Sequence, residues 1–199
     1  MSRLIPIHWK KFEKFVLFVG SKSRVKGIMF LINSMKKVWK KNPKIKLVLM
    51  GPPTKEFEEF FKELDEDIKN KIIDLGIANE KTKKNAFAAC DILALPSISE
   101  SFGMVYVEAW SFGKPVIGCN IASTSEIIED HKNGLLVSFE KLDELSNAIN
   151  YLVENSSIAQ KYGLEGKKKA EFFTSTDNLK NFEEICITTV NSFKNKQLQ

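Results

Sequence analysis

The sequence predicts an α/β protein built on a doubly wound parallel sheet of about six strands. Three observations indicate this fold. Apolar runs alternate with segments of helical spacing, the runs are apolar at successive positions, and most of them end at glycine or proline. Strands that are apolar on both faces are covered by helices on both sides, as in parallel sheets. Alternating strands and helices form right-handed βαβ units, which join such strands into one sheet.

The first half of the chain is predicted to contribute three strands and three helices. Strand-like runs at 15–19, 45–50 and 71–75 are each followed by a glycine. Apolar residues at helical spacing predict helices at 26–41 and about 54–70. A further helix is expected at 79–90, with Asn79 as its N-cap.

The second half continues the alternation and then becomes helical. A strand at 91–95 is stopped by Pro96, because proline cannot donate to a strand ladder. The elements expected after it are a helix from Phe102 to about Gly113, a strand at 115–118, a short helix at 123–130, a strand at 134–137, and helices at about 140–154, 156–172 and 177–193. Residues 1–14 are interpreted as an incoming connector, which leaves 15–199 as one domain.

Composition indicates a folded cytoplasmic protein. Of 199 residues, 43% are hydrophobic and 28% charged, which excludes a disordered chain. No apolar run approaches the ~20 residues of a membrane span, and the amino terminus lacks the apolar core of a secretion signal. The three cysteines are far apart and are expected to be buried free thiols. His8 and His131 are isolated, so no metal site is predicted.

The net charge of +5 is modest, and its densest cluster surrounds Trp39. Two interpretations are open: contact with an anionic membrane surface or nucleic acid, or a solvated helix face followed by a strand. We favour the second, so no nucleic-acid partner is predicted, while peripheral membrane contact stays open. The clustered residues are Lys36, Lys37, Lys40, Lys41, Lys44 and Lys46.

Two carboxylates eight positions apart, Glu100 and Glu108, carry the clearest functional signal. A helix is expected to begin between them at Phe102-Gly103, and a helix start offers unpaired N–H groups and a positive dipole end to a diphosphate. Carboxylates accept hydrogen bonds from hydroxyl groups. Helical rise places Glu108 roughly 7–8 Å beyond Gly103. The pattern predicts a nucleotide-sugar site with Glu108 at the ribose and Glu100 at the sugar. The alternative is a surface acid and a helix acid that only favours the dipole.

The loop from Gly20 to Gly27 is the second candidate element. Lys22, Arg24 and Lys26 supply cations for phosphate oxygens there. The loop lacks the Gly-Lys-Ser/Thr ending of a Walker loop and the Gly-x-Gly-x-x-Gly dinucleotide motif. It follows a strand, as the Glu100 segment does, so both are expected at the same sheet edge, where ligands of such sheets bind.

Taken together, these motifs resemble the nucleotide-sugar-binding half of retaining glycosyltransferases with the GT-B fold, the group that includes glycogen and sucrose synthases and many mannosyltransferases. The resemblance covers about residues 15–190, and it implies a Rossmann-like half-domain with additional C-terminal helices. The matching residues are, in order, Phe18-Val19-Gly20, Lys26-Gly27, Leu49-Met50-Gly51-Pro52, Leu75-Gly76, Ala89-Cys90-Asp91, Leu95-Pro96-Ser97, Glu100-Ser101-Phe102-Gly103, Glu108-Ala109, Gly113-Lys114-Pro115-Val116-Ile117, Ser125-Glu126-Ile127-Ile128 and Asn133-Gly134-Leu135-Leu136-Val137.

The resemblance also implies roles for individual residues. Glu100 contacts the donor sugar, Glu108 contacts the ribose, and Lys26 neutralises the diphosphate. The N–H groups near Phe102, Gly103, Met104 and Val105 hold the diphosphate, Gly20 shapes the first loop, and the backbone at Ile77 meets the base. Many relatives carry arginine where this chain has Ser21, so Lys22 or Arg24 is expected to replace it. The implied reaction is hexosyl transfer from a UDP- or GDP-linked sugar with retention, without a metal or protein nucleophile.

The resemblance further implies a missing partner. Members of the group have two Rossmann-like domains with the acceptor domain first, so this chain is expected to be a donor-domain fragment that turns over poorly alone. The acceptor is expected to be a glycan or a lipid-linked glycan, which places the protein in the cytoplasm or at the inner membrane face. The apolar side of the 177–193 helix is expected to favour self-association. A non-catalytic nucleotide-sugar module and a GT-B nucleotide-sugar epimerase remain alternatives.

Overall fold

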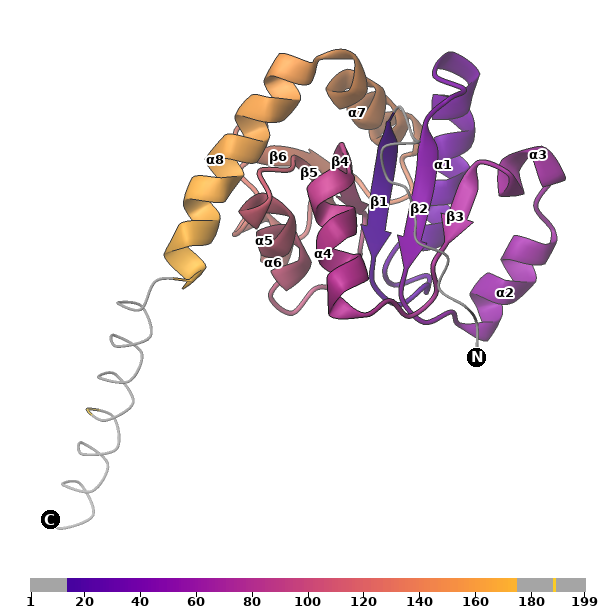
Figure 1. Ribbon diagram of the computed structural model, residues 1–199, viewed down its shortest axis with the longest axis horizontal. Coiled ribbons are helices and arrows are strands. Elements are labelled where there is room, and N and C mark those ends of the chain that lie inside the picture. Colours follow the sequence, from indigo (N-terminus) through magenta and orange to yellow (C-terminus); the bar gives the residue numbers. More distant parts are fainter. Residues whose placement is uncertain (1–13, 175–187, 189–199) are drawn as a thin grey trace, which may run out of the picture.

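The computed structural model describes residues 14–174 and residue 188, and its centre is a six-stranded parallel sheet (Figure 1). The strands lie in the order β3-β2-β1-β4-β5-β6, and every neighbouring pair is parallel. Their bounds are β1 Phe15–Val19, β2 Lys46–Met50, β3 Ile72–Asp74, β4 Ile92–Leu95, β5 Val116–Cys119 and β6 Gly134–Val137. The predicted doubly wound α/β fold is confirmed.

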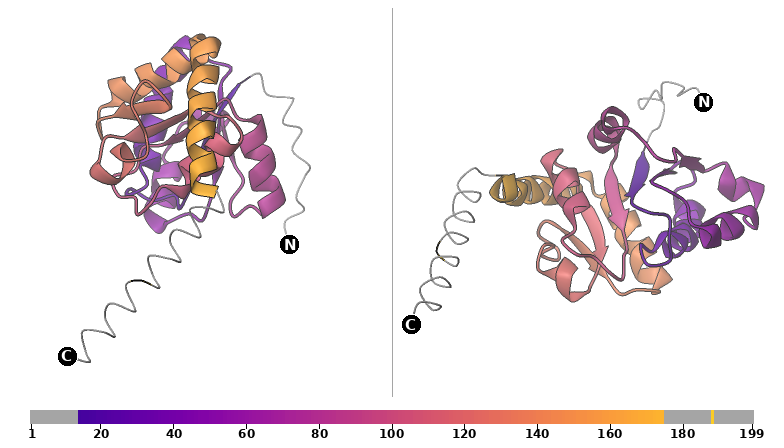
Figure 2. Two further views of the ribbon diagram at one scale, coloured as in Figure 1. Left: turned by 90° about the vertical axis from the view of Figure 1, so that its left-hand side faces the viewer. Right: turned by 90° about the horizontal axis from the view of Figure 1, so that it is seen from below.

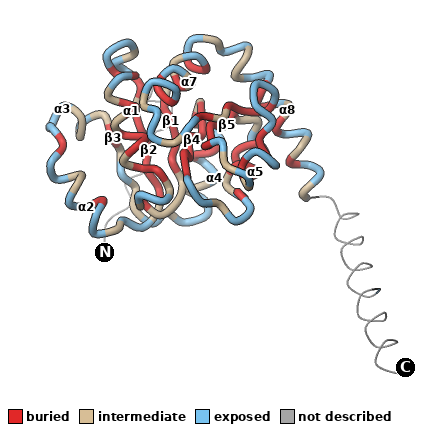
Figure 3. The backbone as a smooth tube through the Cα atoms, turned by 180° about the vertical axis from the view of Figure 1, so that it is seen from behind, coloured by how far each residue is buried: buried red, intermediate tan, exposed pale blue. Residues whose placement is uncertain are grey.

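Helices cover both faces of the sheet. In Figure 1, α4 and α5 lie in front of the strands, and α8 packs along α5. Figure 3, viewed from behind, shows α1 and α7 on the opposite face, where they pack against each other. The helices are α1 Ile28–Lys41, α2 Lys55–Lys62, α3 Glu66–Lys69, α4 Glu80–Ala89, α5 Met104–Ser111, α6 Ala122–Ser125, α7 Leu142–Glu154 and α8 Ser156–Thr174.

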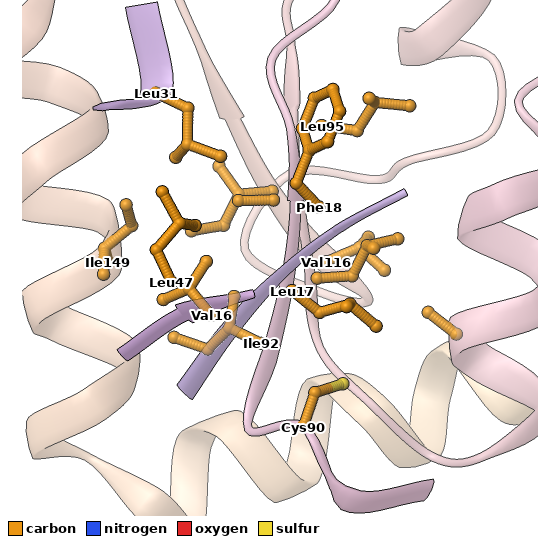
Figure 4. Close-up of a cluster of buried hydrophobic side chains, with 14 of the residues drawn as sticks. Val16, Leu17, Phe18, Leu31, Leu47, Cys90, Ile92, Leu95, Val116 and Ile149 are labelled. Carbon is orange, nitrogen blue, oxygen red and sulfur yellow. The ribbon is translucent and has the colours of Figure 1, made fainter. Parts of the chain in front are cut away.

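The core lies along the strands, which Figure 3 colours as buried. Val16, Leu17 and Leu47 are fully buried, and side chains of this cluster stand on both sides of β1 (Figure 4). Burial on both faces is the reason that these strands are apolar at successive positions rather than alternating. Tyr106 and Trp110 of α5 are also fully buried, so this helix is anchored deep in the molecule.

Cys90 and Cys119 are buried free thiols, as expected. Burial raises the pKa of each thiol to about 12. We therefore predict that neither thiol reacts with iodoacetamide at pH 8 in the folded protein, because the thiolate is the reactive form, and that both react in guanidinium. The experiment is done in a Cys186→Ser variant, so that these two are the only thiols present, and mass spectrometry measures how many of them are labelled. Rapid labelling of either thiol in the folded protein would contradict the structure.

The same two thiols give stability a pH dependence. Unfolded thiols ionise near pH 8.5, well below the pKa of the folded ones. Because the folded state favours the neutral thiol, the contribution of these thiols to the free energy of unfolding is fully present below about pH 8.5. It is lost as the pH rises above that value.

Two helical predictions differ from the structure, and one lies outside the described residues. The segment 54–70 is two helices, α2 and α3, because α2 ends at Lys62 and the backbone at Asp65, with ψ 146°, is not helical. The helix expected at 123–130 is the four-residue α6, and the chain beyond it folds back to form a bridge between Asp130 and Gly134. The expected connector up to residue 13 and the helix at 177–193, apart from residue 188, are not described.

The strand order places a switch point between β1 and β4. From β1 the chain passes through α1 to β2 on one side, whereas from β4 it passes through α5 to β5 on the other. Ligands of open α/β sheets bind beyond the carboxyl ends of the strands at such a point. The right-hand view of Figure 2 is seen from below, the side toward which the strand arrows of Figure 1 point. We call this side the carboxyl edge.

Candidate functional site

Two helices begin at the switch point, each after a left-handed glycine. Gly27 precedes α1 with φ 73°, and Gly103 precedes α5 with φ 71°. A Cβ atom on Gly27 would lie 2.0 Å from the carbonyl oxygen of Pro96, and one on Gly103 would lie 2.8 Å from the Tyr106 ring. Glycine is therefore required at both positions, and it allows the loops after β1 and β4 to pack against each other.

The helix start predicted at Phe102-Gly103 is confirmed, and its N–H groups are open. The N–H groups of Gly103, Met104 and Val105 donate to no acceptor among the residues that the structure describes. Tyr106 donates its hydroxyl hydrogen to the Leu95 carbonyl at 2.7 Å, which fixes α5 to the end of β4. Burial raises the pKa of Tyr106, so the phenol stays a donor. Open N–H groups at a helix start are suited to an anion, and here they stand on a rigid support.

Lys26 and Glu100 form an ion pair across the switch point. The Lys26 ammonium lies 2.7 Å from Glu100 Oε1 and 3.2 Å from the Ser99 carbonyl oxygen. The Glu100 side chain is 9% exposed and that of Lys26 27%. The loops that carry them are joined by the bond from the Ile98 N–H to the Val25 carbonyl, 2.9 Å long. Lys26 and Glu100, the two residues that the resemblance assigns to the reacting diphosphate and sugar as catalytic residues, thus lie together beside the start of α5.

Glu108 lies on α5, and its partner is a residue that the sequence did not indicate. Lys83 of α4 places its ammonium 2.6 Å from Glu108 Oε1. The side chains are 24% and 37% exposed, respectively. Within the described residues, nothing donates to the second carboxylate oxygen of Glu108 or of Glu100. Each acid therefore keeps one oxygen that can accept a hydrogen bond from a ligand hydroxyl.

Lys22 has a different role from the expected one. Its side chain is 1% exposed, and its ammonium lies 2.6 Å from both carboxylate oxygens of Asp74, at the end of β3. It is therefore not presented to a phosphate, and the expectation that it replaces the missing arginine is wrong. Burial forces a lysine to take an anionic partner, and Asp74, the last residue of β3, is that partner. Arg24 is two-thirds exposed and lies 3.5 Å from Glu140, so its cation is accessible from solvent.

Lys22 and three glycines join the loops of the first three strands. The Gly20 N–H donates to the Met50 carbonyl, and the Gly51 N–H donates to the Gly76 carbonyl at 2.8 Å. Ile77, expected at the base, follows Gly76 and is 79% exposed. Exposed apolar side chains also occur at Val25, Ile98, Phe102 and Met104, all in loops of the carboxyl edge or at the start of α5.

Two hollows of the surface lie away from the candidate site residues. A hollow of about 640 Å³ lies between α1 and α3, lined by Trp39 and Asp67 among others, and one of about 400 Å³ lies near Ile45. Neither is lined by a candidate site residue.

No group of three or more metal-ligating side chains occurs in the described part of the chain, and none of its helices is long and apolar enough to cross a membrane. Three of the clustered lysines contact other residues: Lys37 with Asp143, Lys41 with Glu154, and Lys46 with the Asn70 carbonyl.

Comparison with known proteins identifies the family of the chain. Residues 6–169 match the family model described as glycosyl transferases group 1. The chain belongs to this family. Its sheet and helices correspond to one half of the GT-B fold found in its structural neighbours. The site residues above lie within the matched segment, at the edge of the sheet.

Three relatives of this group 1 domain show how much of each protein the match covers. An uncharacterized glycosyltransferase of Methanocaldococcus jannaschii is 29% identical over 184 residues, which cover 92% of this chain and 45% of the relative. The Anabaena protein Alr3699/HepE in complex with UDP-glucose is 26% identical with a TM-score of 0.75, covering 89% and 49% of the two chains. The C-terminal domain of the group 1 protein LpcC from Francisella tularensis is 26% identical with a TM-score of 0.72, covering 82% and 88%. The chain thus spans about half the length of full relatives.

Proposed function

We propose that this domain binds a nucleoside diphosphate sugar at the carboxyl edge and forms the donor half of a retaining glycosyltransferase, within the glycogen synthase, sucrose synthase and mannosyltransferase group. The observation that carries the proposal is the grouping of the Lys26–Glu100 pair with the open N–H groups of α5 at the switch point. The similar Anabaena protein, crystallised in complex with UDP-glucose, supports this class of ligand.

The ligand lies along α5 in this proposal. The diphosphate occupies the helix start, held by the N–H groups of Phe102 to Val105, and Lys26 neutralises part of its charge. Glu108, further along the helix, accepts hydrogen bonds from the ribose hydroxyls through its open oxygen. Glu100 does the same for the sugar. The backbone at Ile77 meets the base, beside the first loop that begins at Gly20, and Arg24 adds a cation near the phosphates.

The chemistry follows from charge. During transfer the bond between the anomeric carbon and the diphosphate oxygen breaks, the acceptor hydroxyl oxygen bonds to that carbon, and its proton passes to the departing diphosphate oxygen. The departing nucleoside diphosphate gains negative charge at the helix start and Lys26, which are already oriented to stabilise it. We propose that these groups supply the stabilisation without a divalent metal, so that nucleotide affinity is the same with and without EDTA.

An acceptor-binding half completes the site in this proposal. The carboxyl edge carries exposed apolar residues such as Ile98 and Phe102, which a facing domain would cover. The chain's span of 45% of its Methanocaldococcus relative leaves room for such a half in the relative. The acceptor class that we propose is a glycan or a lipid-linked glycan.

The Glu100 assignment gives a specific prediction. Glu100→Gln should not weaken binding of a bare nucleoside diphosphate, because the sugar is the only part of the ligand that Glu100 contacts and Lys26 keeps its charge when their 2.7 Å pair is lost. It should weaken binding of the matching nucleotide-sugar by about tenfold, the value of one charge-assisted hydrogen bond. Calorimetric titration with both ligands measures the difference. Glu165→Gln removes an acid from a Lys168 pair of the same 2.7 Å length on α8 and serves as the control. Equal losses for both ligands would refute the assignment.

A further inference from the structure

We propose that Lys83 positions Glu108 for the ribose and thereby gives the site its preference for ribonucleotides over 2′-deoxyribonucleotides. The inference rests on the proposed ribose contact of Glu108. The observation behind it is the 2.6 Å ion pair between the two side chains, which come from different helices.

Two contacts hold α4 and α5 in a fixed register. Lys83 pairs with Glu108, and Phe87, four residues later, stacks on Phe112, which is four residues after Glu108. The ring centroids are 6.0 Å apart with an interplanar angle of 13°. The Lys83 ammonium also lies 5.9 Å from the Phe87 ring centroid. Residues four apart lie on the same helix face, and Phe112 is the C-cap directly after α5. The ion pair and the stacked rings therefore form two successive contacts between α4 and the α5 segment.

The register fixes one oxygen of Glu108 and leaves the other open. Lys83 contacts Oε1, and none of the described residues donates to Oε2. Without Lys83, a half-exposed glutamate on a helix surface samples several rotamers, and ordering it would weaken ligand binding. With Lys83 in place, the open oxygen is oriented before the ribose arrives.

Lys83 also offsets an unfavourable charge. Glu108 lies on the helix whose start is the proposed diphosphate site, and an unpaired carboxylate there repels a diphosphate. Lys83 neutralises this carboxylate. The neighbouring Lys84 carries the same charge, but it is exposed and has no contact with a described acid. Lys84 therefore serves as a control for charge alone.

The test compares ribonucleotides with their deoxy forms. Calorimetric titration of the full chain with UDP, 2′-deoxy-UDP, GDP and 2′-deoxy-GDP gives a ribo-to-deoxy affinity ratio for each base. We expect a ratio of about ten or more in the wild type, from one charge-assisted hydrogen bond. Lys83→Met should lower this ratio at least threefold, a loss of at least about 0.65 kcal/mol of discrimination. Lys83→Arg and Lys84→Met should retain it. A purely structural role would weaken both forms equally and leave the ratio unchanged.

The outcomes separate this inference from the proposed function. If Lys83→Met keeps the ribo-to-deoxy affinity ratio of the wild type while Glu108→Gln loses it, the role of Lys83 is overturned and the proposed site stands. A wild type that binds none of the nucleotides or shows no ribose preference would overturn the role of Glu108 and the inference with it. Thermal unfolding verifies that each variant is folded. Lys83→Ala, which favours the helix, replaces Lys83→Met if the latter does not fold.

Discussion

Glu108→Gln is expected to weaken binding of the preferred nucleoside diphosphate about tenfold to a hundredfold. The glutamine keeps the volume of the side chain but removes the charge that strengthens its bonds to the ribose hydroxyls, which is worth about 1.5–3 kcal/mol. It also leaves Lys83 without its partner 2.6 Å away. Calorimetric titration with the nucleoside diphosphate measures the loss, and the matching 2′-deoxynucleotide should lose less.

The control for this variant is the same substitution at an acid that forms a similar ion pair outside the candidate site. Glu129→Gln removes a carboxylate that lies 2.6 Å from Lys132, away from the carboxyl edge, and should leave binding unchanged. The melting temperature of Glu108→Gln should stay close to that of the wild type, because the pair with Lys83 is partly exposed and such pairs contribute little to stability. Unchanged nucleotide affinity in Glu108→Gln would remove Glu108 from the site.

Asp74→Asn is expected to destabilise the fold by about 3–5 kcal/mol. The Lys22 side chain is 1% exposed, and both carboxylate oxygens of Asp74 lie 2.6 Å from its ammonium. Asparagine leaves that buried cation with a neutral partner, which is the costly way to break a buried ion pair. The free energy of unfolding in urea measures the loss.

Lys22→Met is the matched control from the other side of the same pair. Methionine has a similar length, and it packs in apolar surroundings that include the Phe57 ring, 5.4 Å from the ammonium. Asp74 is one-third exposed and still accepts the Gly76 N–H, so its charge remains solvated. The loss should therefore be clearly smaller than in Asp74→Asn. A larger loss in Lys22→Met would mean that Lys22 does not depend on Asp74.

The sheet was predictable because each strand is an apolar run, and most of these runs end at a glycine or a proline. Apolar runs such as 15–19 and 91–95 agree with β1 and β4 to within a residue. The errors occur where local spacing competes with a cap or a turn. Asp65 begins a new helix inside the apolar periodicity of 54–70. The helix at 123–130 is cut short, where the chain beyond α6 turns to form the bridge at Asp130.

The candidate site was only partly predictable, because strand order brings together loops but not individual partners. The sequence placed Lys26 and Glu100 at one sheet edge, and the structure pairs them. It assigned Lys22 the same exposed role, although a lysine buried in a well-packed loop needs an acid beside its ammonium. Asp74 could have been recognised as an acid inside the apolar run Ile72-Ile73-Asp74-Leu75. Lys83 lies among other charged residues of α4, and only its spacing to Phe87, matched by Glu108 and Phe112, distinguishes it.

The most direct test of a nucleotide-sugar site at the carboxyl edge is calorimetric titration of the wild-type chain without added metal. The ligands are UDP, GDP and ADP, each also as its glucose or mannose conjugate. We predict that one base series binds with a dissociation constant in the micromolar to millimolar range, and that Glu108→Gln weakens that series. Absence of binding by all of these ligands at millimolar concentration would contradict the proposal that this domain holds the donor.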